Sequence, residues 1–392
     1  MSSVLLFLLG FLTAFGAQNA LRSPKRNRPW WAQPLWLPAM LTSELLPVRF
    51  AASGALAAVF VSFGALDHFV GGFGALLLVL GWIGYLLLAA RARRAPRSAA
   101  LALQIPPPRP ISLPLQRRAT RYPFSVPSDI DRVDDIEYAD GCTLDLYRGV
   151  ASTGNRVLLQ IHGGGWTGGD KRQQARPLMH HLANRGWTVV SISYPLSRDE
   201  GLDARIAAVH EAIRWVRHDA ESFDIDPEFI ALTGGSAGGH LASLATLQSS
   251  RNGTGVQACI PIYGVYDFVN RNRTRGDWPV IPKILMGAEV SAAPERYAAA
   301  SPIDQVHENA PPFLVIHGTH DSLVPPAEAR HFVSALEAVS RSEVSLFEVP
   351  GATHSFDIVP SPRTRTVVSA IETFLERASD RYDDDAMEQR SR

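Results

Sequence analysis

The chain of 392 residues is long enough for two domains, or for one large domain with an appended segment. Its 38 lysines and arginines balance 38 aspartates and glutamates, which excludes a strongly basic protein of the kind that binds nucleic acids. The only two cysteines, Cys142 and Cys259, lie far apart, which excludes a disulfide framework and a cysteine-based metal site.

Three long apolar segments come first, at residues 2–19, 50–66 and 69–90. The first and third contain no charged side chain, and the second follows directly on Arg49. A helix needs about 20 apolar residues to cross the hydrocarbon core of a bilayer, and about 17 is the lower limit. Residues 1–97 are therefore predicted to form a membrane region with three transmembrane helices.

Two parts of this membrane region require a separate interpretation. Residues 2–19 could be a cleaved signal peptide, but the start MSSV lacks basic residues and FGA is a poor cleavage site. Residues 28–48 are rich in tryptophan, interrupted by prolines and contain Glu44. Because indole rings favour the level of the lipid headgroups, we expect this stretch at the membrane interface.

Basic residues flank the predicted spans on one side only. They follow the first span, precede the second and follow the third: Arg22, Lys25, Arg26, Arg28, Arg49, Arg91, Arg93, Arg94 and Arg97. Basic loops are retained in the cytoplasm during membrane insertion. The sequence therefore predicts a multi-pass protein of the lipid bilayer whose downstream part lies in the cytoplasm.

Composition changes again after the third apolar segment. Residues 98–124 include the proline-rich stretch 105–116, which predicts an extended, semi-rigid linker, and residues 98–130 are a candidate lid. At the other end, the polar residues 379–392 are predicted to form a disordered tail.

Between these segments, residues 125–378 alternate short β-rich runs with amphipathic helical ones. The first two strands are predicted to form an antiparallel hairpin around Asp140 and Gly141. In residues 203–218, apolar side chains recur at helical spacing on one face. This alternation predicts an α/β domain, with a mostly parallel sheet covered by helices on both faces.

Four predicted strands end in loops that carry reactive or unusually flexible residues. Such sheets collect functional residues in the loops at the carboxyl ends of their strands. Strand 157–161 leads to HGGGWTGGDK, strand 229–233 to Ser236, strand 313–318 to Asp321, and strand 344–349 to His354.

Ser236 lies in the pattern G-x-S-x-G between a predicted strand and a predicted helix. The serine could simply cap the helix. With Asp321 and His354 following in that order, it is predicted to be the nucleophile of a Ser-His-Asp triad. Asp304 and Asp357 are less suitable acids, because no strand precedes the first and the second lies only three residues beyond His354.

The run of glycines after His162 lacks the G-K-[ST] that a phosphate-binding loop needs. We expect it instead to form an oxyanion hole, from the N–H groups of Gly164, Gly165 and Ala237. His162 is expected to position this loop, and Trp166 to line the substrate pocket or to pack. The chemistry needs no cofactor, and no metal-ligand spacing is present.

These motifs are similar to those of the hormone-sensitive-lipase-like and BD-FAE-like carboxylesterases of the α/β-hydrolase superfamily. The matching stretches within residues 125–378 are HGGGW, GGSAGGHLA, HGTHDSLVP and GATHSF. The resemblance implies an α/β-hydrolase fold and hydrolysis of carboxylic esters. The predicted position of the domain beside the bilayer favours lipophilic esters as substrates. Gly235, where the lipase-like branch usually has Asp, and YPLSRDE, where it usually has YRLAPE, favour the BD-FAE-like branch.

Three other functions fit parts of the same sequence pattern. An acyltransferase would use the same triad to pass the acyl group to another alcohol, and no residue separates it from an esterase. A peptidase would use the triad on an amide, which needs more acid assistance. A non-catalytic ligand-binding relative should lack a member of the triad, and none is missing here.

Overall fold

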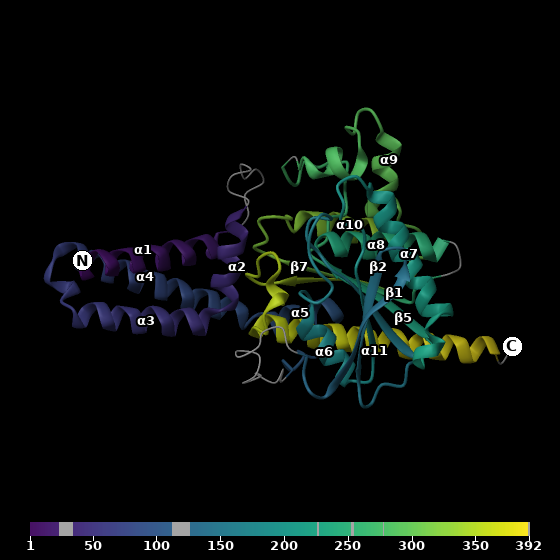
Figure 1. Cartoon of the computed structure of the whole chain (residues 1–392), viewed down its shortest axis with the longest axis horizontal. Coiled ribbons are helices and arrows are strands. Elements are labelled where there is room, and N and C mark those ends of the chain that lie inside the picture. The colour runs from purple at the N-terminus through teal and green to yellow at the C-terminus, as the bar shows by residue number, and fades with distance from the viewer. Residues whose placement is uncertain (23–33, 112–125, 226, 252–254, 277, 391–392) are drawn as a thin grey trace.

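The computed structural model describes residues 1–22, 34–111, 126–225, 227–251, 255–276 and 278–390. It has an elongated helical region at the amino-terminal end and an α/β domain formed by the rest (Figure 1). Lys25, Arg26 and Arg28, and residues 112–124 of the expected linker, lie outside the described residues.

In the helical region, α1 (Ser2–Leu21), α3 (Leu46–Ser62) and α4 (Phe69–Ala92) lie side by side and extend away from the α/β domain (Figure 1). The short turn η2 (Ala65–Asp67) joins α3 to α4 at the far end. Helix α2 (Trp36–Glu44) lies across the near end.

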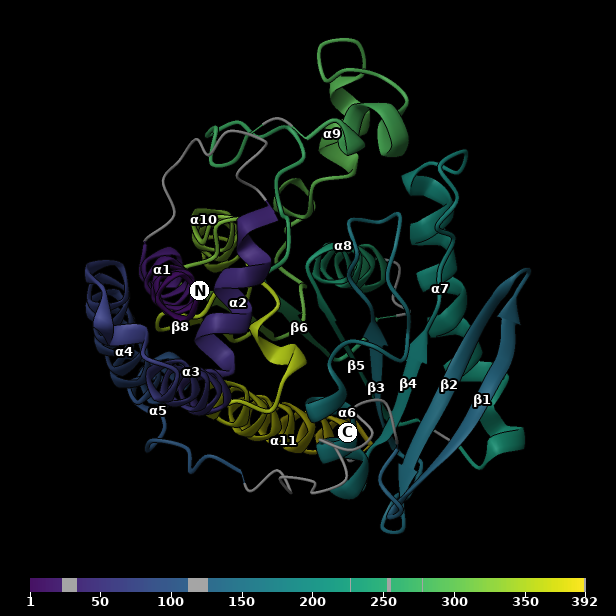
Figure 2. The ribbon, with the colours of Figure 1, turned by 60° about the vertical axis from the view of Figure 1, so that its left-hand side comes forward.

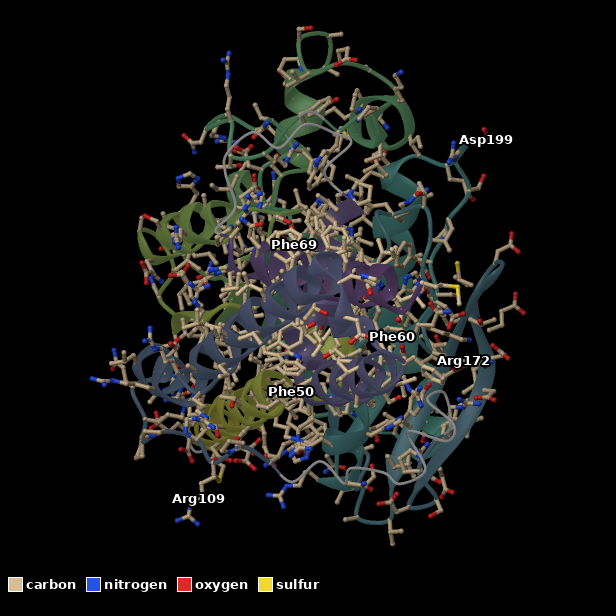
Figure 3. The ribbon with its side chains drawn as sticks, turned by 90° about the vertical axis from the view of Figure 1, so that its left-hand side faces the viewer. Phe50, Phe60, Phe69, Arg109, Arg172 and Asp199 are labelled. Atoms are coloured by element: carbon tan, nitrogen blue, oxygen red, sulfur yellow. The ribbon has the colours of Figure 1, made fainter. Side chains whose placement is uncertain are left out.

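By length and composition, two of these described helices could cross a membrane. A third span results if α2 and α3 are counted together, although they meet at an angle of 89°. The view along the bundle shows aromatic side chains such as Phe50, Phe60 and Phe69 on these helices (Figure 3). Phe50 and Phe69 are exposed.

The α/β domain is built on an eight-stranded sheet in the order β1-β2-β4-β3-β5-β6-β7-β8. Strands β1 and β2 form the predicted antiparallel hairpin, β2 also pairs antiparallel with β4, and all other pairs are parallel. The strand bounds are β1 Ile130–Ala139, β2 Cys142–Gly149, β3 Arg156–Ile161, β4 Thr188–Ile192, β5 Phe229–Gly235, β6 Ala258–Ile262, β7 Phe313–Gly318 and β8 Val344–Val349. The predicted α/β fold class is confirmed.

Helices cover both faces of the sheet, and each face has its own apolar core (Figure 2). One core includes α7 (Leu202–His218), α8 (Ala237–Arg251) and α10 (Ala327–Glu337). The other includes α5 (Ala95–Leu103), α6 (Arg176–Asn184) and α11 (Pro362–Arg390). The remaining helical turns are η3 Ala220–Phe223, η4 Ile281–Met286, α9 Pro294–Ala299, η5 Pro302–Asp304 and η6 Phe356–Ile358.

The structure departs from the sequence analysis at both ends of this domain. Residues 98–103, expected in a linker or lid, belong to α5, where Ala99 and Leu103 are buried in a core. The tail expected to be disordered continues α11 as far as Arg390. The polar composition of this tail gave no sign of its two tertiary contacts. Tyr382 packs against Phe229, and Arg381 pairs with Glu343.

The helical region is docked directly on the α/β domain rather than only tethered to it. Arg363 of α11 is 1% exposed, and its guanidinium donates to the backbone oxygen of Ser43 at 3.1 Å and of Leu88 at 3.2 Å. It also forms a buried ion pair of 3.1 Å with Glu44. Removing one partner of such a pair would leave an uncompensated buried charge, so this contact couples the two regions.

Candidate active site

Ser236 lies on a sharp turn between β5 and α8. Its φ of 56° is unusual for a residue with a side chain, and its N–H donates to the oxygen of Ile262 at 2.9 Å. The flanking glycines make this turn possible. A Cβ on Gly234 would lie 2.5 Å from the carbonyl carbon of Gly238, and a Cβ on Gly238 would lie 2.0 Å from the oxygen of Ile161.

The structure brings Ser236, His354 and Asp321 together in one chain of hydrogen bonds. The serine Oγ lies 3.0 Å from His354 Nε2, and His354 Nδ1 lies 2.7 Å from Asp321 Oδ2. The two less suitable acids lie elsewhere, because Asp304 pairs with Arg271 and Asp357 accepts the hydroxyl of Tyr263. With the proton on Nδ1, the imidazole can accept the serine proton at Nε2.

Asp321 is fully buried, and its surroundings favour the ionised form. Its Oδ1 accepts the N–H groups of Leu323 and Val324, both at 2.9 Å. Burial by itself would raise the pKa of Asp321, but the neighbouring His354 and His317 lower it to about 2. These neighbours therefore favour the charged carboxylate.

The glycine loop offers backbone donors close to the serine. Gly164 and Gly165 have φ values of 129° and 62°, which glycine adopts most readily. Among the described residues, no hydrogen-bond acceptor takes the N–H of Gly164, Gly165 or Ala237. That of Ala237 is free because it begins helix α8.

Side chains outside the glycine loop contact its first residues. Gln174, which sequence reasoning missed, accepts the N–H of Gly163 at 2.7 Å. His162 stacks on Tyr194 with ring centroids 4.4 Å apart, and the Tyr194 hydroxyl donates to the oxygen of His162 at 3.0 Å. Burial lowers the pKa of His162. Its Nδ1 lies 2.8 Å from the backbone oxygen of Gly163, which places the ring against the glycine loop.

Trp166, expected either to line the pocket or to pack, is only 2% exposed. Its indole N–H donates to His240 Nδ1 at 3.2 Å, and its carbonyl accepts from Arg205 at 2.9 Å. Burial lowers the pKa of His240 to about 4, so Nδ1 stays free to accept. This geometry favours the packing alternative, in which Trp166 anchors the end of the glycine loop.

Two aromatic side chains that the sequence analysis did not assign contact the His354 ring. Tyr263 lies with its ring centroid 4.7 Å away, and Trp36 of α2 contacts the imidazole edge-on at 5.5 Å. Tyr263 also explains Gly235, since a Cβ there would lie 2.7 Å from the Tyr263 hydroxyl. Trp36 comes from the helical region, and only the tryptophan-rich composition of its segment marked it.

Residues 144–336 match the BD-FAE family model. The probable carboxylic ester hydrolase LipM of Mycobacterium tuberculosis is 41% identical over 61% of this chain and 59% of its own length. Esterase LipQ of the same organism is 40% identical over 62% of each chain. The chain therefore contains an α/β-hydrolase domain that is similar to carboxylesterases.

A solved structure supports the same fold. A truncated carbohydrate esterase from gut microbiota superposes with a TM-score of 0.57 at 22% identity, over 64% of this chain and 96% of its own. The matches to LipM and LipQ span about three fifths of those relatives' lengths. In the described part of the chain, no group of three or more His, Cys, Asp or Glu side chains could hold a metal ion.

Proposed function

We propose that this protein is a membrane-anchored serine esterase that hydrolyses lipophilic carboxylic esters. The observation that carries the proposal is the hydrogen-bonded chain from Ser236 through His354 to Asp321, beside the unbound N–H groups of the glycine loop. Its similarity to named esterases supports the ester bond as the target.

The geometry suggests how each group acts. The Ser236 oxygen attacks the ester carbonyl while His354 Nε2 takes its proton, and Asp321 stabilises the imidazolium that forms. The N–H groups of Gly164, Gly165 and Ala237 donate to the negative oxygen of the tetrahedral intermediate. His354 then returns the proton to the leaving alcohol. Water attacks the acyl-serine in the same way, with His354 again accepting a proton, and releases the acid.

A fluorophosphonate probe tests this proposal directly. Such a probe phosphonylates an activated serine, so we expect one equivalent to abolish hydrolysis of p-nitrophenyl butyrate and to modify Ser236, as located by peptide mass spectrometry. An unmodified Ser236 in an enzyme that hydrolyses the ester would contradict the proposal. Adding a primary alcohol distinguishes the acyltransferase alternative, since an esterase should still release mainly the free acid.

We also propose that the hydrolase domain lies in the cytoplasm, close to the membrane. The described basic residues Arg22, Arg49 and Arg91 all lie where α1, α3 and α4 approach the domain, whereas the amino terminus and η2 lie at the far end (Figure 1). Positive charges on one side of a set of spans resist translocation of that side.

A reporter fusion tests this topology. A reporter that works only in the cytoplasm should be active when fused after residue 390, and one that works only outside the membrane should be inactive. The basic flanks predict this result because they would keep the α/β domain on the side where the chain is made. The reverse pattern would place the hydrolase domain outside the cytoplasm.

A further inference from the structure

The His354 ring is in contact with a part of the chain that lies outside the hydrolase fold. Trp36, the first residue of α2, meets the imidazole edge-on with ring centroids 5.5 Å apart. His354 itself is 2% exposed, whereas Trp36 and Ser236 are both half-buried. The indole therefore packs against the histidine and remains partly exposed.

The position of α2 relative to His354 is fixed by a second contact at the other end of this helix. Arg363 binds Ser43 and Glu44 of α2, and its Nε donates to the oxygen of Pro350 at 2.9 Å. Pro350 begins the loop that carries His354. One buried guanidinium thus joins α2 to the loop of the general base, so Trp36 is held against the ring.

Helix α2 also marks where a membrane surface would lie. It runs across the end of the bundle at which α1 ends, α3 begins and α4 approaches the α/β domain (Figures 1 and 2). On the bundle beyond it, large apolar side chains are exposed, among them Phe11, Phe15, Leu80 and Leu87. An amphipathic indole at this level is typical of the membrane–water interface.

We propose that Trp36 is a specificity-determining residue that contacts the bound ester and favours long-chain esters entering from the bilayer past α2. The inference rests on the proposed serine esterase function. A long acyl chain leaving the bilayer would lie along the apolar indole on its way to Ser236, whereas a short, water-soluble ester can reach the serine with less of this contact.

The experiment uses the full chain in phosphatidylcholine–phosphatidylglycerol vesicles, with p-nitrophenyl palmitate in the vesicles and p-nitrophenyl butyrate in the water. Trp36→Ala should lower kcat/KM for both esters, and at least tenfold more for palmitate than for butyrate. Trp36→Phe should restore most of the lost preference, because a ring remains. Leu37→Ala, a neighbouring exposed position on α2, is the matched control and should leave the ratio within twofold.

Two results would overturn the proposal. If Trp36→Ala lowers both values by the same factor, the indole acts only on His354 and does not select the ester. If Leu37→Ala shifts the ratio as much as Trp36→Ala, the effect comes from the membrane contact of α2 as a whole. A wild-type protein that hydrolyses neither ester and resists the fluorophosphonate would instead refute the esterase function on which the inference rests.

Discussion

Replacing Ser236 with alanine should abolish ester hydrolysis, with a loss in kcat of about a million-fold by comparison with other serine hydrolases. The variant keeps the glycine loop and the imidazole but has no atom to form the acyl intermediate. The Ser236 Oγ bonds only to His354 among the described residues, so the substitution removes one hydrogen bond, the one to His354 Nε2.

The measurement is kcat for p-nitrophenyl butyrate together with the thermal unfolding midpoint. The midpoint of Ser236→Ala should lie within a few degrees of that of the wild type. Ser250→Ala is a matched control, because Ser250 lies on the same helix α8 and its hydroxyl donates to the backbone oxygen of Thr246. That variant should keep its activity. A Ser236→Ala variant that retains a tenth of the wild-type turnover would contradict the role given to this serine.

Sequence reasoning located the sheet well because strand signals are local. The apolar runs at 157–161, 313–318 and 344–349 correspond to β3, β7 and β8 within one residue. The amphipathic segment 203–218 is α7 with one residue added. A buried strand and an amphipathic helix can each be predicted from the pattern of apolar side chains within the segment itself. The loops that follow the strands were then placed by topology.

Contacts between distant segments carry no such local signal. Glu44 and Arg363 are 319 residues apart, and in the sequence neither can be distinguished from an ordinary charged residue. Trp36 had no such signal either. The tryptophan-rich composition of its segment indicated a membrane interface but not a contact with His354. His240 belonged to a recognised motif, yet its hydrogen bond to Trp166 depends on how α8 packs under the glycine loop.

These missed contacts change how the two regions are expected to work together. A proline-rich linker alone would leave the α/β domain free to turn relative to the helical region. The contacts of Arg363, and those of Arg91 with the oxygen of Leu21 at 3.1 Å and with His320 at 2.8 Å, remove that freedom. His320 immediately precedes Asp321, and Pro350 begins the loop that carries His354. The contacts of Arg91 and Arg363 therefore reach two of the loops that carry the proposed triad.

Replacing Asp321 with asparagine should lower kcat by about 10⁴-fold while substrate binding changes little. The N–H groups of Leu323 and Val324 bind Oδ1, so the amide oxygen of asparagine should take that place. Its NH₂ group then replaces Oδ2 and faces His354 Nδ1. A donor at this point forces the imidazole proton onto Nε2, where the ring can no longer accept the proton of Ser236.

The loss of activity in Asp321→Asn should not depend on pH. Since the pKa of Asp321 is about 2, the wild-type carboxylate stays ionised from pH 5 to 9, and no pH in that range should rescue Asp321→Asn. Kinetics over this range, with KM reported separately, provide the measurement. Asp304→Asn serves as the control, because Asp304 pairs with Arg271 and should be replaceable with little loss of activity. A 10⁴-fold loss in Asp304→Asn or Asp357→Asn, with an active Asp321→Asn, would assign the acid to that other residue.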